Sequence, residues 1–296
     1  MSGAATSVAR LAADETTARR IADAFLESYD PGEAAAGAYE DGGGWTVAIH
    51  FRQAPNETAV RALVALAAGA EAANSLTFET VASDDWVKAS LAGLAPVRAG
   101  RFIVHGSHDR AQVARNAIGI EIEAALAFGT GHHGTTRGCL LALDRLLRAR
   151  HPHRVVDIGT GSGVLAIAAA KVLRRGVVAG EIDARAIATA RANARINGVG
   201  GLIDFVHGGG VNARRLRAGA PFDLVLANIL AGPLQRLAAP LASCLAPNAH
   251  VILSGLLPAH ANAVLSAYRA QNLVLARRIV LDGWVSLVMV KPRLRK

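Results

Sequence analysis

Short apolar runs alternate with amphipathic stretches along the chain, and this pattern predicts an α/β protein. The signal is clearest in the second half, where the β-branched run 155–158 leads through a glycine-rich turn into an alanine-rich helix from Val164. Further strands are predicted at 177–181, 203–206, 222–227, 251–254, 274–280 and 284–290, with helices at 137–148, 184–196, 233–245 and 258–271. Asp282-Gly283 joins the last two strands as a hairpin, which completes a seven-stranded sheet.

The N-terminal part carries a weaker pattern of the same kind. Strands are predicted at 7–12, 33–40, 45–51 and 76–81, and helices at 15–29 and 57–68. This order is compatible with a βαββαβ ferredoxin-like unit. We therefore expect an α+β domain at 1–83, a connector at 84–100 that contains Ala95-Pro96, and a second domain at 101–296.

The composition allows one large or two ordinary domains, because 296 residues with 52% hydrophobic content can bury a full core. Cys139 and Cys244 are far apart in sequence, which disfavours a disulfide framework or a zinc site and favours a reducing cytoplasm. The N-terminus lacks the pattern of a signal peptide. The uncharged stretch from Leu237 to Tyr268 is interrupted by proline, asparagine and histidine, so it predicts buried core and no membrane span.

The chain is strongly basic. Its formal charge of +9 and pI near 10.5 suit an encounter with nucleic acid or a ribonucleoprotein. Only four of the 32 basic residues are lysine, and an alanine- and arginine-rich composition can also reflect the base composition of the gene. Because the arginines are dispersed and form no block of like charge, both interpretations stay open.

Three glycines, Gly159, Gly161 and Gly163, follow the strand 155–158. Glycine tolerates positive φ and lets a ligand approach the backbone without meeting a Cβ. The helix that follows points its unpaired N–H groups at that ligand. A dinucleotide fingerprint would require a small residue in place of Val164, so this spacing disfavours a pyrophosphate ligand.

Polar residues end two of the predicted strands. Glu181 lies about twenty residues beyond the glycines, where a nucleoside ribose is bound in such a fold, and we predict that it accepts hydrogen bonds from the ribose hydroxyls. Asp183 directly precedes the next helix, so we interpret it as an N-cap in preference to a ligand contact. Asn228 follows the strand 222–227 and is a further candidate, because the carboxyl edge of an open α/β sheet forms the ligand crevice.

A second glycine-rich loop, 127–136, leads into the helix 137–148. Helical N–H groups and the Thr136 hydroxyl would face a ligand carboxylate there. An N-cap role explains a threonine at this position equally well. His132 and His133 suggest a metal site, but they are neighbours on one loop without a further ligand at metal spacing, so we expect no metal.

The segment Asp157-x-Gly159-x-Gly161-Ser162-Gly163 resembles motif I of class I S-adenosylmethionine-dependent methyltransferases. Two more motifs are Ala127-Phe128-Gly129-Thr130-Gly131-x-His133-x-Thr135-Thr136 and Ala227-Asn228-Ile229-Leu230-Ala231-Gly232-Pro233-Leu234. The three together resemble the ribosomal protein L11 methyltransferase family, over about 85–290. The resemblance implies an α/β class I methyltransferase fold with a Rossmann-like seven-stranded sheet and an N-terminal ferredoxin-like domain.

The same resemblance implies a reaction. The cofactor would be S-adenosyl-L-methionine, and the substrates would be lysine and N-terminal amines of ribosomal protein L11, recognised by the N-terminal domain. The implied cofactor-binding residues are Thr136, Asp157, Gly159, Gly161, Glu181 and Asn228. Asn228 is also the expected catalytic residue, because methyl transfer depends mainly on positioning and a neutral amide can orient an amine. Contact with ribosomal RNA is a further expectation, a membrane partner is not expected, and the location is cytoplasmic.

Departures from the family pattern occur at three places: Glu123-Ala124-Ala125 stands for Asp-Pro-Gly, Gly134 for proline and Glu181 for aspartate. The alternatives are a methyltransferase acting on another protein or on ribosomal RNA, and a non-catalytic ribosome-assembly factor. Enzymes that methylate base amines typically carry an aromatic residue shortly after the asparagine, where this chain has Ile229-Leu230-Ala231. Whether His132 or His133 accepts a proton through water is left open.

Overall fold

The computed structural model describes residues 6–29, 34–41, 44–51, 53–81, 96–122, 134–211 and 213–293. Contacts within the chain divide it into two compact units, Met1–Ser90 and Leu91–Lys296, and each has its own hydrophobic core. Most of the expected connector at 84–100 lies outside the described residues. Strand β5 (Val97–Ala99) falls inside that range, yet it already belongs to the second unit.

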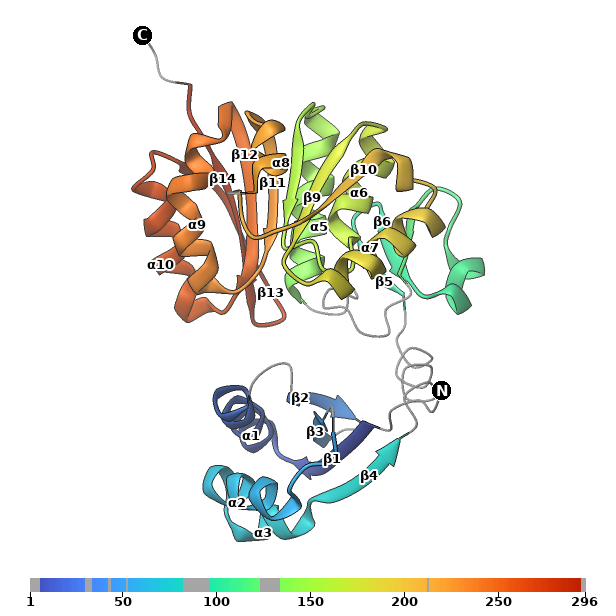
Figure 1. Ribbon diagram of the computed structural model, residues 1–296, viewed down its shortest axis with the longest axis vertical. Helices are drawn as coiled ribbons and strands as arrows, with labels where there is room; N and C mark the ends of the chain where they lie inside the picture. The colour runs from blue at the N-terminus through green and yellow to red at the C-terminus, as the bar shows by residue number, and fades with distance from the viewer. Residues whose placement is uncertain are drawn as a thin grey trace. The chain divides into compact units, whose positions relative to one another are not determined.

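The first unit is a four-stranded antiparallel sheet with helices on one face (Figure 1). Its elements are β1 (Thr6–Ala13), α1 (Glu15–Ser28), β2 (Ala34–Asp41), β3 (Gly44–Phe51), α2 (Glu57–Ala68), α3 (Ala70–Ser75) and β4 (Thr77–Val81). The strand order β2-β3-β1-β4 confirms the predicted ferredoxin-like arrangement. The short helix α3 is an addition that the sequence pattern does not predict.

Local sequence explains where these helices begin. Asp14 caps α1 by accepting a hydrogen bond from the Thr17 amide at 3.0 Å, and Asn56 caps α2 through the Ala59 amide at 3.2 Å. Between the helices and the sheet lies an apolar core that includes Leu11, Ile21, Phe25, Val47, Ile49, Val60 and Val64. Alternate residues of β3, such as Val47 and Ile49, therefore face the helices across this core.

The second unit is built on a seven-stranded sheet of order β10-β9-β8-β11-β12-β14-β13 (Figure 1). Its strands are β8 (Val155–Ile158), β9 (Val177–Glu181), β10 (Ile203–His207), β11 (Phe222–Asn228), β12 (Leu245–Leu256), β13 (Val274–Leu281) and β14 (Trp284–Val290). Strands β8 to β12 are parallel, and β14 runs antiparallel to both of its neighbours. The predicted seven-stranded sheet is thus confirmed.

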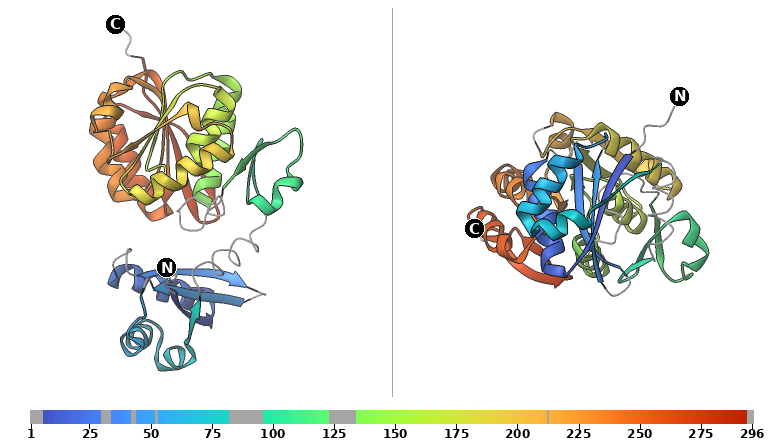
Figure 2. Two further views of the ribbon diagram at one scale, coloured as in Figure 1. Left: turned by 45° about the vertical axis from the view of Figure 1, so that its right-hand side comes forward. Right: turned by 90° about the horizontal axis from the view of Figure 1, so that it is seen from below.

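Helices cover both faces of this sheet (Figure 2). One apolar core contains α5 (Gly134–Ala149), α6 (Val164–Leu173) and α7 (Ala184–Ile196). The other contains α8 (Arg214–Ala218), α9 (Ala231–Ser243) and α10 (Pro258–Arg269). Successive residues of β11 alternate between the two cores, Leu224 and Leu226 facing the first and Val225 the second. The sheet is therefore buried on both sides, as a parallel sheet requires.

A separate three-stranded sheet precedes α5 in the chain. It consists of β5, β6 (Phe102–His105) and β7 (Ile118–Glu121), with the 3₁₀ helix η1 (Ser107–Gln112) between the last two. The sequence pattern predicts a strand at 101–105 and an extended stretch that ends at Ile122, but not that they form a sheet of their own. Polar contacts attach this sheet to the helices behind it. Asp144 of α5 accepts from Arg101 Nε at 2.5 Å, Lys171 of α6 donates to the Gly119 carbonyl, and Asn197 after α7 donates to the Glu121 carbonyl at 2.6 Å.

The C-terminal elements differ from the prediction in length more than in kind. Strand β12 spans twelve residues where four are predicted, and helix α8 is not predicted at all. The hairpin turn is confirmed: Asp282 and Gly283 have φ angles of 49° and 76°, as a two-residue turn with two left-handed positions requires. Across the described segments, no helix combines the length and the apolar character needed to cross a membrane.

Candidate active site

The glycine turn after β8 has the backbone conformation that the sequence predicts. Gly159, Gly161 and Gly163 have φ angles of 70°, 54° and 85°, which residues with a side chain rarely adopt. A Cβ on Gly159 would lie 2.3 Å from the side-chain Cγ2 atom of Ile229. The Gly159 amide donates to the Gly180 carbonyl at 2.8 Å, which ties the turn to β9. A side chain at position 159 would therefore force Ile229 to move.

Asp157 lies beneath this turn and is almost fully buried. Its Oδ2 atom accepts from the Thr160 hydroxyl at 2.7 Å and from the Ala166 amide at 3.1 Å. Its Oδ1 atom is buried without a hydrogen-bond partner among the described residues. Burial raises the pKa of Asp157 to about 7 against the effect of the two hydrogen bonds, and the charge of Glu181 raises it further. The carboxyl group thus holds the turn to the first turn of α6.

Glu181 ends β9 next to the glycine turn. Its Oε2 atom accepts from the Gly161 amide at 3.0 Å, while Oε1 accepts from the Ile182 amide at 2.7 Å and the Asp183 amide at 3.2 Å. The carboxylate is therefore fixed between two turns at the carboxyl edge of the sheet. Asp183 accepts from the Arg185 amide at 2.8 Å and caps α7, so its predicted N-cap role is confirmed.

Asn228 ends β11 and meets the first turn of α5. Its Nδ2 atom donates to the hydroxyls of Thr135 at 3.4 Å and Thr136 at 3.3 Å, and both threonine side chains are buried. Helix α5 begins at Gly134, three residues before the predicted start, so both threonines lie within its first turn. The fold brings together Thr136 and Asn228, which the sequence proposes separately.

Ser254 is a member of this site that the sequence does not single out. It pairs with Asn228 in the parallel register of β11 and β12, and it is fully buried. Its hydroxyl donates to the Thr135 carbonyl at 3.2 Å and lies 2.8 Å from the hydroxyl of Ser286. A signal for it exists, because Ser254 ends the predicted strand 251–254 at the same sheet edge as Asn228. Thr135 is a second residue of this site that the sequence does not single out, because the resemblance implies its neighbour Thr136 as the cofactor-binding residue.

Two other glycines let the segments of this edge pack closely. A Cβ on Gly134 would lie 2.6 Å from the carbonyl oxygen of Leu281, in the β13–β14 hairpin. Gly255 has a φ of 85°, and a Cβ there would lie 2.4 Å from the Ile229 carbonyl oxygen. Glycine in place of proline at position 134 therefore allows α5 to begin directly against the hairpin.

The described residues contain no group of three or more histidine, cysteine, aspartate or glutamate side chains that could hold a metal ion. His132 and His133, with the rest of the loop 127–133, lie outside the described residues. Across the described part of the edge, the side chains that meet are neutral amides and hydroxyls, and Glu181 is a half-buried carboxylate on the neighbouring strand β9.

Comparison with known proteins shows which family the chain belongs to. The profile of the ribosomal protein L11 methyltransferase family matches residues 9–292. The chain belongs to this family. It is 57% identical to the ribosomal protein L11 methyltransferase of Rhodopseudomonas palustris (strain BisB5), over 97% of this chain and 98% of that protein. It is 54% identical to the Bradyrhizobium diazoefficiens protein of the same name, over 94% of each.

A solved structure of a family member also resembles this one. The crystal structure of ribosomal protein L11 methylase from Lactobacillus delbrueckii subsp. bulgaricus is 27% identical, with a TM-score of 0.61. The match covers 68% of this chain and all of that chain. The class I methyltransferase fold expected from the sequence is therefore confirmed.

As a member of the L11 methyltransferase family, the protein is an S-adenosyl-L-methionine-dependent methyltransferase. The residues at the carboxyl edge fit that cofactor. Gly159 provides backbone without a side chain, Glu181 provides a carboxylate bonded to the Gly161 amide, and Asn228 provides an amide next to the threonines of α5. When bound there, the cofactor supplies an activated methyl group on a positively charged sulfur.

Proposed function

We propose that this enzyme methylates lysine side chains and the N-terminal amine of ribosomal protein L11. The proposal rests on membership of the family and on one observation: at the carboxyl end of β11, Asn228 holds a neutral amide against the threonine hydroxyls of α5. A neutral amide can orient an uncharged amine without competing for its lone pair, which must attack the methyl group. This arrangement suits transfer to nitrogen, where positioning contributes most of the rate.

Within this proposal, the residues that contact the cofactor are Thr136, Gly159, Gly161, Glu181 and Asn228. Asp157 acts with them through the glycine turn, which it fixes at Thr160 and Ala166. Asn228 has a second role as the catalytic residue. Its Nδ2 atom is engaged by the threonine hydroxyls, so its side-chain oxygen is the atom available to accept a hydrogen bond from the substrate amine.

The amine must lose a proton before it attacks. At pH 7 this costs roughly 4 to 5 kcal/mol for a lysine with a pKa of about 10.4, but only about 1 kcal/mol for an N-terminal amine with a pKa near 8. A site that excludes water lowers both values, because burial disfavours the charged amine. Asn228 then needs only to hold the neutral amine in line with the methyl group, and a strong base is not required.

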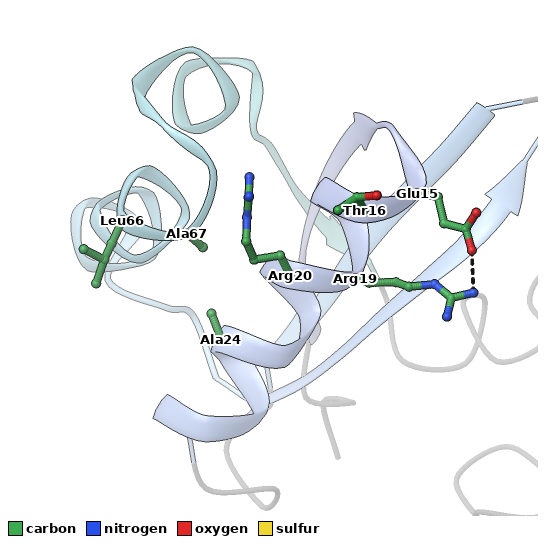
Figure 3. A pocket seen from close by; sticks show the side chains of 7 residues that line it. All are labelled: Glu15, Thr16, Arg19, Arg20, Ala24, Leu66 and Ala67. Carbon is green, nitrogen blue, oxygen red and sulfur yellow. Dashed lines mark ion pairs between the residues drawn. The ribbon is translucent and has the colours of Figure 1, made fainter. Parts of the chain in front are cut away.

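The two units divide this work in our proposal. Every side chain proposed for the cofactor site comes from the second unit, and the first unit recognises the ribosomal protein. The first unit offers a shallow groove between α1 and α2 for such a contact (Figure 3). Arg20 and the exposed Leu66 line this groove, together with Arg19 and Glu15, which form an ion pair at 2.7 Å. A mixed basic and apolar groove suits a protein surface.

We further propose that the reaction takes place in the cytoplasm and that the enzyme meets ribosomal RNA together with its protein substrate. The net charge of +9 favours contact with RNA through attraction to phosphate. Cys139 and Cys244 are both free and buried, which fits a reducing compartment.

The proposed function is tested by incubating the enzyme with labelled S-adenosyl-L-methionine and purified ribosomal protein L11, followed by mass spectrometry of the product. We expect methyl groups on lysines and on the N-terminus. Asn228→Ala should lower turnover roughly 10- to 100-fold, which corresponds to about 1 to 3 kcal/mol of lost hydrogen bonding. Asn262→Ala, on the exposed surface of α10, is the control and should keep wild-type turnover. Label on RNA or on another protein, with none on L11, would refute the proposal.

A further inference from the structure

A second groove opens far from the cofactor site, along helix α7 and the edge strand β10. Three arginines line it, Arg191 and Arg195 from α7 and Arg215 from α8, together with Asp204. It lies toward the amino end of β10, whereas the glycine turn and Asn228 lie at the carboxyl ends of their strands. We refer to it as the arginine groove.

The charges of this groove are unbalanced. Arg215 pairs with Asp204 through two contacts of 2.9 and 3.0 Å. Arg191 and Arg195 are one helical turn apart, at a spacing where like charges repel each other. Among the described residues that line the groove, three guanidinium groups thus face a single carboxylate. An anionic ligand would relieve this repulsion.

The guanidinium groups are held where a ligand can reach them. Arg191 Nη2 donates to the Phe205 carbonyl of the edge strand at 3.2 Å, and the residue remains exposed. One bond of this kind fixes the side chain and leaves most of its five N–H donors for a ligand. Gly198 and Gly201 form part of the wall, and a Cβ on either would meet no atom within 4 Å. The backbone is therefore open to a ligand between the arginines.

The arginine groove continues into a neighbouring one. Gly201, Ile203 and Asp204 line both, and the second groove passes the amino ends of β8, β9 and β11. There Arg154 adds a further guanidinium, which donates to the Ala220 carbonyl at 3.2 Å and is exposed. A continuous track with positive charge along its length suits a linear polyanion better than a single small anion.

We propose that the arginine groove binds the phosphate backbone of RNA. Arginine is suited to phosphate because its planar fork presents two parallel N–H donors. This inference rests on the proposed encounter of the enzyme with ribosomal RNA and assigns that contact to a surface. Methyl transfer takes place at the carboxyl ends of the strands, on the opposite side of the sheet from this groove. RNA can therefore stay bound while an amine reaches Asn228.

The test compares two triple variants of the full-length enzyme with equal net charge. Arg191→Gln/Arg195→Gln/Arg215→Gln removes the charge of the groove. Arg269→Gln/Arg277→Gln/Arg278→Gln removes three exposed arginines elsewhere, one at the end of α10 and two on β13, the opposite edge strand. Binding of a fluorescently labelled RNA hairpin is measured over a range of salt concentrations. We expect the groove variant to bind at least 10-fold more weakly and the control less than 2-fold more weakly. The salt slope of the groove variant should be smaller by about two, because each phosphate that a protein neutralises adds roughly 0.7 to 0.9 to that slope.

Four results of the binding measurements would overturn the inference. Equal weakening in both variants would mean that dispersed charge binds RNA, and no weakening in either would place the contact elsewhere. Displacement of the hairpin by inorganic phosphate at equal phosphate concentration would identify a small-anion site, and displacement by polyglutamate would identify a site for acidic protein. Methylation of free L11 is measured in parallel and should be unchanged in the groove variant. If the wild type fails to methylate L11 yet binds RNA through the groove, only the proposed function fails.

Discussion

The two units differ most in where they bury polar groups. Among the described residues of the first unit, Ser7 is the one buried polar side chain and His50 is half-buried, while the apolar core is aliphatic and aromatic. The second unit buries a row of hydroxyl, amide and carboxyl groups, and many lie at the carboxyl edge of its large sheet: Thr135, Thr136, Asp157, Thr160, Ser162, Ser254 and Ser286. Burying a polar group costs free energy unless it is hydrogen-bonded.

This difference in buried polar groups indicates that the two units have different roles. In the second unit the polar groups form a connected chain, in which Ser286 contacts Ser254, Ser254 contacts Thr135, and Thr135 contacts Asn228. Such a chain fixes the position of side chains that chemistry requires. The first unit has an apolar core that fixes a shape and leaves its exposed faces to recognise a partner. Changes to either unit should therefore have separable effects, and the largest should come from removing the first unit altogether.

Removing residues 1–90 should cut methylation of intact L11 by about 100-fold or more while cofactor affinity stays within about 2-fold of wild type. The reason is that the first unit would raise the local concentration of substrate amines near Asn228, and the shortened chain no longer has this advantage. Methylation is measured with labelled cofactor, and affinity by calorimetric titration with S-adenosylhomocysteine. Circular dichroism checks that the shortened chain is folded. If the second unit alone methylates L11 at the wild-type rate, the first unit is not needed to recognise the substrate.

Gly159→Ala should weaken cofactor binding by about 2 to 4 kcal/mol, because it adds backbone strain at positive φ and a Cβ that Ile229 must move to admit. The matched control is Gly198→Ala. Gly198 has a φ of 69°, close to that of Gly159, but a Cβ there meets no atom within 4 Å. The control should lose stability in thermal unfolding and keep its affinity. Similar affinities for both variants would remove the glycine turn from the site.

Glu181→Ala should weaken cofactor binding by about 1 to 3 kcal/mol, the usual cost of losing hydrogen bonds to a charged acceptor. Asp183→Ala, two residues away, should instead lower the free energy of unfolding by about 1 kcal/mol through loss of the α7 cap. Calorimetry and urea unfolding on both variants separate the two effects. The reverse assignment would show that the ribose acceptor is Asp183.

The two units should respond to pH in opposite directions. Burial raises the pKa of Asp157 to about 7, while an unfolded aspartate ionises near pH 3.9. The folded protein therefore holds a proton that the unfolded chain has released, and stability falls as pH rises from about 4 to 7, by at most about 1.4 kcal/mol per pH unit. Burial, with the charge of Arg10, lowers the pKa of His50 to about 4. The unfolded chain then binds the proton first, and stability falls as pH drops from about 6.5 to 4.

These slopes are measured by urea unfolding of the wild type, Asp157→Asn and His50→Gln at intervals from pH 4 to pH 8. Relative to the wild type, Asp157→Asn should gain stability as pH rises toward 7, and His50→Gln should gain as pH falls below 6.5. Profiles parallel to that of the wild type would show that neither group titrates as its burial indicates.

Much of this fold could be predicted because strand and helix periods are local. The strands of the four-stranded and seven-stranded sheets, the cap at Asp183 and the turn at Asp282-Gly283 follow from nearby residues. Helix α8 is not predicted because its five residues include three arginines and carry no helical apolar period. Strand β12 is predicted too short because Pro247 and Asn248 are typical of a turn, whereas Asn248 takes a φ of 61° inside the strand.

The site could be predicted only in part, because its contacts join distant segments. Asn228 and Thr135 are separated by 93 positions, and no periodicity links them. Because the carboxyl ends of parallel strands lie at one edge of a sheet, Glu181 and Asn228 can be predicted as site residues. The same rule does not predict that the first turn of α5 contacts Asn228. The position of Asp157 beneath the turn, bonded to Thr160 and Ala166, likewise follows from packing and not from spacing.

The small sheet of β5, β6 and β7 has a mechanical consequence. β5 is the first described strand of the second unit, and it belongs to this sheet and not to the seven-stranded one. Tension on the chain from the first unit would pass into α5, α6 and α7 through Asp144, Lys171 and Asn197. Three helices would share the force before any strand that ends in a site residue felt it. The small sheet therefore spreads a pull on the chain over three helices, of which α5 carries Thr135 and Thr136 in its first turn.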